Sequence, residues 1–247
     1  MNVPSEDLER VRQALEEATS VFVITGAGIS AESGVPTFRT LGGIWQQVDP
    51  MKVATPEAFA ADPERVWEFY NDRRVHLKQC AVNPGHEALA RLERRKENML
   101  ILTQNVDSLH EDAGSERVIH IHGSIWEVRC TGCRKVTINR ATPILELPPH
   151  CSCGAMLRPN VVWFGETISP IQCTLVERFL EQHSPQVTLV IGTEASFGYI
   201  VSWALETKRS DSLLVEINPG VTDLSGTADV CLRGPSGEIL PRLISLR

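Results

Sequence analysis

The fold is decided by the stretch Val21-Phe22-Val23-Ile24-Thr25-Gly26-Ala27-Gly28-Ile29-Ser30-Ala31. Its four leading apolar residues are typical of a buried strand, and the rest fits the pattern G-x-G-x-x-G/A. In that fingerprint the glycines let the backbone approach a pyrophosphate, whose oxygens accept bonds from N–H groups. The stretch therefore predicts a dinucleotide site at Gly26, Ala27 and Gly28, although an ordinary glycine turn could have the same letters.

The second half of the fingerprint is missing. An acidic residue that closes a second strand about 20 residues further on would bind the ribose. That region reads Gly43-Ile44-Trp45-Gln46-Gln47, without an acid. An ordinary nicotinamide dehydrogenase is therefore disfavoured.

Further apolar runs alternate with helical patterns along the chain. The runs are 99–102, 187–191 and 213–217, and helical patterns cover 86–96 and 171–183. This alternation predicts an α/β fold, a Rossmann-like doubly wound parallel sheet whose ligand crevice lies beyond the carboxyl ends of the strands. The residues of the polar or glycine-bearing segments that follow the strands should meet there: Thr103, Gln104, Asn105, Gly192, Thr193 and Asn218.

Two stretches break the alternation and predict a smaller lobe formed by two insertions. Residues of about 44–79 have a helical pattern, and residues of about 124–159 contain four cysteines in turn-rich sequence. The Rossmann-like part would then comprise about 1–43, 80–123 and 160–247 of a single catalytic domain.

The clustered cysteines predict one structural zinc ion. Cys130 and Cys133 form one pair, and Cys151 and Cys153 form a second, tighter pair. Four thiolates at about 2.3 Å leave no position open for water, so the metal would not take part in chemistry. His150 is a possible substitute ligand if the tight pair is strained.

Two histidines, His120 and His122, alternate in a short segment that a strand would place on one face. A histidine is more often a hydrogen-bonded structural residue than a catalyst. A neutral imidazole is nevertheless a suitable general base for a sugar hydroxyl near pH 7.

Charge and composition exclude several function classes. The net charge of −7 argues against binding to phosphate backbones as the main function, and residues 124–160 carry too small a basic surplus for strong nucleic-acid binding. The N-terminal residues resemble neither a secretory signal nor a transit peptide, and no apolar run approaches the roughly 20 residues that span a bilayer. We expect a cytoplasmic protein with no membrane partner.

The ordered motifs resemble those of the sirtuins. They are Gly26 to Arg39 (GAGISAESGVPTFR), Gln104 to Asp107 (QNVD), His122-Gly123, the paired cysteines and Asn160 to Glu166 (NVVWFGE). The resemblance extends from about Val21 to Pro241. It implies an NAD⁺-dependent deacylase that acts on acylated lysines of proteins and releases nicotinamide and O-acyl-ADP-ribose.

The resemblance also implies roles for individual residues. His122 would be the general base on the ribose hydroxyls, and Asn105 would take part in catalysis. Asn105 and Asp107 would bind the ribose and the nicotinamide carboxamide. The remaining NAD contacts would come from Phe38, Arg39, Gln104, Gly192, Thr193, Asn218 and Ser236. An extended segment with Val161, Trp163, Phe164 and Gly165 would pair with the substrate peptide, although both rings could simply be core.

The chain departs from the common sirtuin pattern on the adenosine side. Glu194 replaces a usual serine, and Asn218-Pro219-Gly220 lacks an acidic residue that is often found there. These departures put cofactor affinity in doubt more than the chemistry.

A tyrosine and an arginine in the first insertion indicate the acyl preference. Tyr70 and Arg73 fall on a helical stripe with Val66 and Leu77, where periodicity predicts an apolar residue in place of Arg73. The arginine head could simply reach water. Tyr-x-x-Arg here resembles the sirtuins that remove succinyl, malonyl and glutaryl groups, so a negatively charged acyl group is favoured, with some deacetylation.

Two alternatives stay open. A sirtuin-like mono-ADP-ribosyltransferase would use NAD⁺ with another acceptor. A non-enzymatic module would use the zinc-binding piece to contact a partner.

Overall fold

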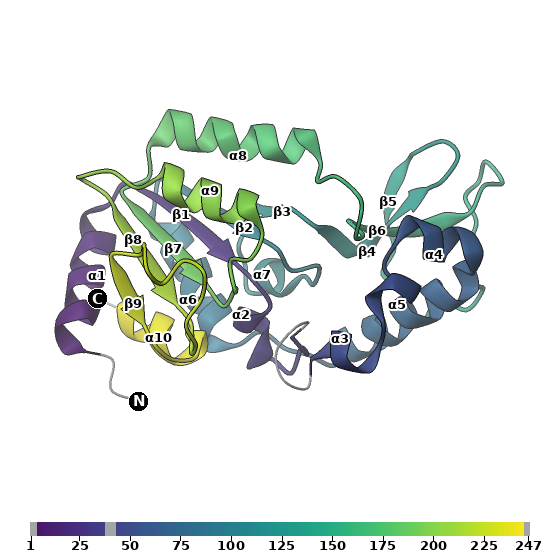
Figure 1. The fold of residues 1–247 in the computed structure, drawn as a ribbon, viewed down its shortest axis with the longest axis horizontal. Coiled ribbons are helices and arrows are strands. Elements are labelled where there is room, and N and C mark those ends of the chain that lie inside the picture. Colours follow the sequence, from purple (N-terminus) through teal and green to yellow (C-terminus); the bar gives the residue numbers. More distant parts are fainter. Residues whose placement is uncertain (1–3, 38–42, 245–247) are drawn as a thin grey trace.

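A six-stranded parallel sheet forms the centre of the computed structural model, which describes residues 4–37 and 43–244 (Figure 1). Every neighbouring pair of strands in it is parallel. The strands in spatial order are β3 (Val118–His120), β2 (Asn98–Thr103), β1 (Ser20–Thr25), β7 (Val187–Ile191), β8 (Leu213–Ile217) and β9 (Val230–Leu232). The order reverses between β1 and β7, as in a doubly wound sheet, so the predicted fold class is confirmed.

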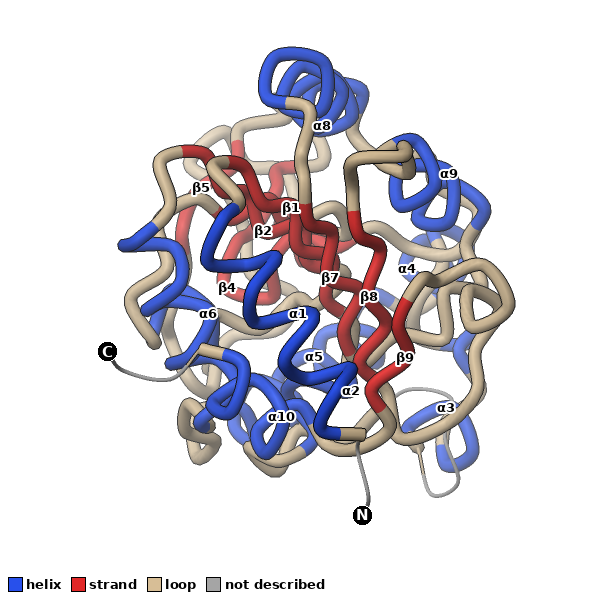
Figure 2. The backbone as a smooth tube through the Cα atoms, turned by 90° about the vertical axis from the view of Figure 1, so that its left-hand side faces the viewer, coloured by secondary structure: helices blue, strands red, loops and turns tan. Residues whose placement is uncertain are grey.

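Helices cover both faces of this sheet (Figures 1 and 2). Alternate residues of β1 face opposite sides, so Val21 and Val23 join one core cluster while Phe22 and Ile24 join another. The first face is covered by α1 (Ser5–Glu17), α6 (Pro84–Arg95) and α10 (Ser236–Leu243), and the second by α8 (Pro170–His183) and α9 (Gly198–Glu206). Two short helices, α2 (Gly28–Ala31) and α7 (Leu109–Asp112), follow β1 and β2.

A smaller lobe stands beyond one end of the sheet, on the right in Figure 1. Its antiparallel sheet has the order β5 (Val136–Ile138), β4 (Gly123–Cys130) and β6 (Leu157–Val161). Its helices are α3 (Ile44–Gln47), the 3₁₀ turn η1 (Pro50–Lys52), α4 (Pro56–Ala61) and α5 (Pro63–Leu77). A third core cluster, which includes Trp67 and Ile125, packs α5 against the small sheet.

Arg74 ties α5 to the cysteine-bearing segment. Its side chain is fully buried, and its guanidinium donates to the carbonyl oxygens of Ile125 at 2.9 Å and Asn139 at 2.9 Å. Burial lowers the pKa of Arg74 to about 10. These bonds hold helix α5 against the segment that carries the cysteines. Losing them would leave the buried Arg74 charge without partners, which is energetically costly.

The expected strand through the two histidines is wrong. β3 ends at His120, and Ile121 and His122 form the turn into β4. The side chains still face one loop, because His120 Nδ1 bonds the Asn105 carbonyl and His122 Nδ1 bonds the Gln104 carbonyl. Among the residues described, no helix has both the length and the apolar composition needed to span a membrane.

Candidate functional site

One cavity of about 1020 Å³ joins the carboxyl ends of the large sheet's strands to the small lobe. Residues from the β1–α2 turn, the loops after β2, β7 and β8, helix α5 and the end of β6 line it. The sequence-predicted residues on its wall are Gly26, Ala27, Gly28, Tyr70, Arg73, Gln104, Asn105, His122, Val161, Trp163, Phe164, Gly165, Gly192, Thr193, Asn218 and Ser236. Phe38 and Arg39, which we also expected to bind NAD, lie outside the described residues.

The glycines of the fingerprint form backbone contacts with Ile191 and Gly192 that the sequence did not indicate. The N–H of Gly26 donates to the Ile191 carbonyl at 3.0 Å, and that of Gly28 donates to the Gly192 carbonyl at 2.8 Å. A Cβ on Gly28 would lie 2.6 Å from the Gly192 Cα. These two N–H groups are therefore occupied within the protein, while Gly26, Ala27 and Gly28 all line the cavity and remain predicted cofactor-binding residues.

His122 lines the cavity with a neutral imidazole. Its Nδ1 lies 3.0 Å from the Gln104 carbonyl, which can only accept, so Nδ1 carries the proton. Its Nε2 is then an acceptor and lies 2.5 Å from the Tyr199 hydroxyl. Burial lowers the pKa of His122, so the imidazole is neutral at pH 7. This arrangement is suited to removing a proton from a hydroxyl group.

Asn105 and Asp107 meet at Ser30 beneath the cavity. The Asn105 amide donates to the Ser30 oxygen at 3.1 Å, and the Ser30 hydroxyl donates to Asp107 at 3.1 Å. Asp107 also accepts from the Leu109 N–H at 3.1 Å. Burial raises the pKa of Asp107, and these bonds oppose the rise. Asp107 does not line the large cavity; it borders a small adjoining one that Asn105 shares.

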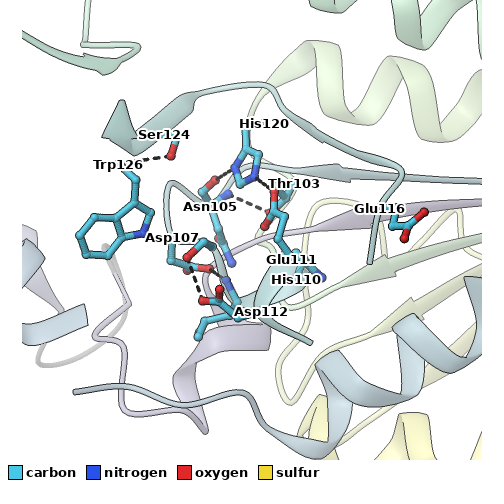
Figure 3. A network of polar contacts seen from close by, with 12 residues as sticks. Thr103, Asn105, Asp107, His110, Glu111, Asp112, Glu116, His120, Ser124 and Trp126 are labelled. Atoms are coloured by element: carbon cyan, nitrogen blue, oxygen red, sulfur yellow. Dashed lines mark hydrogen bonds and ion pairs between the residues drawn. The ribbon is translucent and has the colours of Figure 1, made fainter. Parts of the chain in front are cut away.

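His120 also holds the loop that carries Asn105 and Asp107 (Figure 3). His120 bonds the Asn105 carbonyl at 2.9 Å and Glu111 at 2.5 Å. Burial alone would lower the pKa of His120, but the bond and charge of Glu111 outweigh it and raise that pKa. The ion pair fixes the backbone between the two site residues Asn105 and Asp107.

The part of the cavity that we expect to bind adenosine is built around Thr193. Its hydroxyl accepts from the Gln104 amide at 2.9 Å and from the Ala195 N–H at 3.1 Å. Asn218 donates to the Thr193 carbonyl at 2.9 Å. Across the cavity, the Ser236 hydroxyl donates to Glu32 at 3.3 Å. Glu194 and Pro219, where the chain departs from the sirtuin pattern, both line this part.

The opposite side carries the tyrosine and the arginine of α5. Tyr70 is buried, and its oxygen accepts from Trp163 Nε1 at 2.9 Å. Burial raises the pKa of Tyr70 to about 12, so its hydroxyl proton remains available for donation. The Arg73 guanidinium lies over the Phe69 ring, 5.8 Å from the centroid, and burial lowers the pKa of Arg73. A neutral donor and a desolvated cation therefore face the same cavity.

The segment after β6 is extended only as far as Trp163. Phe164 and Gly165 form a turn, and the Phe164 N–H already donates to the Ala54 carbonyl at 3.0 Å. Trp163 belongs to the small lobe's core, since only 2% of it is exposed, while Phe164 is exposed. The expectation of one extended segment through Gly165 is wrong, because the Trp163 carbonyl accepts from the Glu166 N–H to close the turn.

The four cysteines form one cluster. Cys130 and Cys153 sulfurs lie 3.4 Å apart, and Cys133 and Cys151 sulfurs lie 3.9 Å apart. All four lie within 4.8 Å of one another, and His150 is not part of the group. A tetrahedron with bonds of about 2.3 Å has S–S edges of about 3.8 Å. The tetrad therefore fits one zinc ion without a substitute ligand.

Two residues of the site, Ser30 and Tyr199, could not be identified from the sequence. Ser30 lies within the quoted motif, but nothing in its letters indicated that it bridges Asn105 and Asp107. Tyr199 belongs to no motif, and its contact with His122 joins residues 77 positions apart. Only the fold brings these side chains together.

Comparison with known proteins gives a consistent result. The Sir2 family model matches residues 26–197. The chain is 42% identical to "NAD-dependent protein deacylase 1" of Archaeoglobus fulgidus, with 96% of each chain covered. It is 39% identical to "NAD-dependent protein deacylase sirtuin-5, mitochondrial" of Danio rerio, covering 98% of this chain and 87% of the relative.

Solved structures of Sir2 proteins are similar to this chain as well. A Sir2 homolog in complex with NAD matches with a TM-score of 0.88 and 41% identity over 96% of this chain and 92% of that one. A Sir2–p53 peptide–NAD⁺ complex matches with a TM-score of 0.82 and 28% identity over 96% of each chain.

Proposed function

Because the chain belongs to the Sir2 family, the sirtuins, we propose that it is an NAD⁺-dependent protein-lysine deacylase that prefers negatively charged acyl groups. One observation carries the proposal. The neutral imidazole of His122 lines a single cavity, to which the loops after β7 and β8 contribute Thr193 and Asn218 and helix α5 of the small lobe contributes Tyr70 and Arg73. A dinucleotide and an acyl-lysine can therefore meet at the base.

The chemistry assigned to this chain is proton removal from a ribose hydroxyl. NAD⁺ is the co-substrate and supplies the ribose, nicotinamide being the leaving group. His122 Nε2 takes the proton, and the Gln104 carbonyl stabilises the resulting imidazolium through Nδ1–H. Asn105, held by Ser30, orients the substrate, and the apolar wall excludes water that would otherwise intercept the reactive carbon. The expected products are free lysine, nicotinamide and O-acyl-ADP-ribose.

The acyl preference rests on the pair Tyr70 and Arg73. A terminal carboxylate can accept two parallel N–H bonds from a guanidinium and one bond from a phenol, and charge-assisted bonds are stronger than neutral ones. An acetyl group offers no such acceptor. We also propose that the protein is cytoplasmic, although one relative is named a mitochondrial sirtuin-5.

The test is incubation with NAD⁺ and a matched panel of acetyl-, succinyl- and glutaryl-lysine peptides, followed by mass spectrometry of the products. The proposal expects nicotinamide and O-acyl-ADP-ribose, with the charged acyl groups consumed faster. ADP-ribose attached to the protein in place of O-acyl-ADP-ribose would show an ADP-ribosyltransferase. No nicotinamide release with any peptide would indicate a binding module.

The variant His122→Ala should lose a factor of about 10²–10⁴ in deacylation, the usual contribution of a general base. NAD⁺ binding should persist, as measured by calorimetry. His76→Gln is the matched control: that imidazole also bonds a backbone carbonyl, that of Gly34, but is exposed and does not line the cavity. Full turnover by His122→Ala, or an equal loss in both variants, would contradict the assignment.

A further inference from the structure

The acceptor nitrogen of His122 is already engaged by a side chain of the protein. Tyr199, the second residue of α9, places its hydroxyl 2.5 Å from Nε2. With Nδ1 protonated against the Gln104 carbonyl, Nε2 has one lone pair, and the phenol must be the donor. The lone pair that would take a proton from a substrate is the one that this phenol uses.

We propose that Tyr199 is a reversible cap on His122, which competes with the substrate hydroxyl for Nε2 and must withdraw before the base can act. The proposal deepens the proposed function and rests on His122 being its general base. A neutral imidazole nitrogen cannot accept two protons along one lone pair, so the phenol and the ribose hydroxyl exclude each other there.

The cap is built into α9 by aromatic packing. The Tyr199 ring stacks on Phe197, with centroids 5.6 Å apart and planes at 21°, and meets the edge of Trp203 at 5.6 Å. Phe197 also contacts His122 edge-on, with centroids 5.5 Å apart. Residues 197, 199 and 203 thus form one aromatic group, in which Phe197 and Tyr199 contact His122. Such contacts hold a ring in place by about 0.5–1.5 kcal/mol each, which a bound ligand can outweigh.

The position of Tyr199 also permits withdrawal. Both Tyr199 and Phe197 are half-buried, and both line the cavity, so the phenol borders open space. The residues before it, Ser196 and Gly198, are exposed, and no atom lies within 4 Å of a Cβ built on Gly198. Because Tyr199 lines the cavity, a change of its side-chain rotamer toward the cavity would take the hydroxyl away from Nε2.

The cap has a thermodynamic consequence for the co-substrate. If NAD⁺ binding requires the uncapped state, its apparent affinity is reduced by the fraction of molecules in that state. A net hydrogen bond contributes about 1 kcal/mol, which corresponds to about fivefold in an equilibrium constant. Tyr199→Phe, which keeps the ring and removes the hydroxyl, should therefore bind NAD⁺ about fivefold more tightly.

The chain allows a direct observation of the phenol. It has only two tyrosines, so labelling with fluorotyrosine should give two ¹⁹F NMR signals, which Tyr199→Phe and Tyr70→Phe assign. Addition of NAD⁺ should shift the Tyr199 signal. Tyr70, whose oxygen is bonded to Trp163, serves as the internal reference and should shift far less.

A second measurement follows His122 itself. A bond donated to Nε2 favours the neutral imidazole, so removing it should raise the pKa of His122 in the protein without NAD⁺. Histidine labelled with ¹³C reports that pKa, and the signal missing in His122→Ala identifies it among the seven histidines. With saturating NAD⁺, wild type and Tyr199→Phe should show the same His122 pKa, because the cap has left in both.

The role of Tyr199 can be tested independently of the proposed deacylase activity, because neither NMR measurement needs an acyl substrate or turnover. An unchanged His122 pKa in Tyr199→Phe without NAD⁺ would overturn the cap. So would a Tyr199 signal that does not respond to saturating NAD⁺, since the phenol would then stay on the base. If the protein did not bind NAD⁺, the proposed function would be wrong. The His122 titration would still show whether the Tyr199 hydroxyl bonds Nε2.

Discussion

Gly28 and Gly192 touch backbone to backbone, and this contact joins the first strand's turn to the loop after β7. The Gly28 N–H donates to the Gly192 carbonyl at 2.8 Å. Gly192 has a φ of +59°, and a Cβ on it would lie 2.6 Å from the Ile29 nitrogen. Both residues must therefore be glycine for the β1–α2 turn and the loop after β7 to approach this closely.

Gly192→Ala should destabilise the protein by about 2–4 kcal/mol, from the left-handed backbone and the overlap together. Urea denaturation measures the change. Gly198→Ala is the matched control, because nothing lies within 4 Å of the added Cβ, and it should change stability by less than about 0.5 kcal/mol. Equal effects of the two substitutions would mean that the Gly28–Gly192 contact is not tight in solution.

The cysteine tetrad predicts one zinc ion per chain with a structural role. Cys130→Ala should lose the metal and unfold the small lobe, since thiolate–zinc binding contributes roughly 10 kcal/mol or more to folding of such modules. Metal analysis and circular dichroism check both effects. Cys173→Ala, which removes a thiol outside the tetrad, should keep the metal. Loss of activity in chelator without loss of structure would contradict a purely structural role.

The buried imidazole of His86 should make the folded protein less stable in acid. Burial lowers the pKa of His86 to about 4, against an ordinary value near 6.5. The unfolded chain therefore takes up this proton below about pH 6.5, whereas the folded protein does not until about pH 4. Stability falls as pH drops through that window, by about 1.4 kcal/mol per unit for this group.

Urea denaturation at pH 7.5 and 5.5 tests this sign. The loss of stability between the two pH values should be smaller by about 1.4 kcal/mol in His86→Gln than in wild type. His76→Gln removes an exposed imidazole that also makes one hydrogen bond, to the Gly34 carbonyl, and should keep the wild-type loss. If all three proteins lost the same amount, His86 would not be held neutral by burial.

Four of the six strands of the large sheet, β1, β2, β7 and β8, could be predicted because their side chains are buried on both faces, whereas β9 was missed and the predicted strand at the histidines did not match β3. β7 and β8 begin and end where their apolar runs do, at 187–191 and 213–217. The carboxyl ends of these strands carry Thr193 and Asn218, and the parallel topology brings both to one cavity. Periodicity sufficed there because burial alone sets the pattern.

The details that the sequence did not reveal depend on contacts between distant segments. Alternation placed His120 and His122 on a strand, but the chain turns at Ile121, and their common orientation comes from two carbonyls of the loop at 104–105. Arg74 gave no signal either, since its partners lie more than 50 residues away. Tertiary partners of this kind leave no trace in local spacing.

Arg73 provides the test of acyl preference. Arg73 and Tyr70 line the same cavity, and burial lowers the pKa of Arg73, so a carboxylate there would meet a poorly hydrated cation. Truncating one partner of such a pair costs roughly 2–5 kcal/mol. Arg73→Met should therefore lower kcat/KM for succinyl-lysine by about 30-fold or more, while acetyl-lysine, which offers no carboxylate, is nearly unaffected.

The control for Arg73→Met is Arg65→Met, which removes an exposed guanidinium from the same helix and should affect neither peptide. Tyr70→Phe removes only the hydroxyl and should lower desuccinylation more mildly, since it deletes one neutral donor and not a charge. Both peptides are measured on all four proteins. Equal losses on succinyl- and acetyl-lysine in Arg73→Met would make Arg73 a structural residue that packs on Phe69, and the preference for charged acyl groups would be withdrawn.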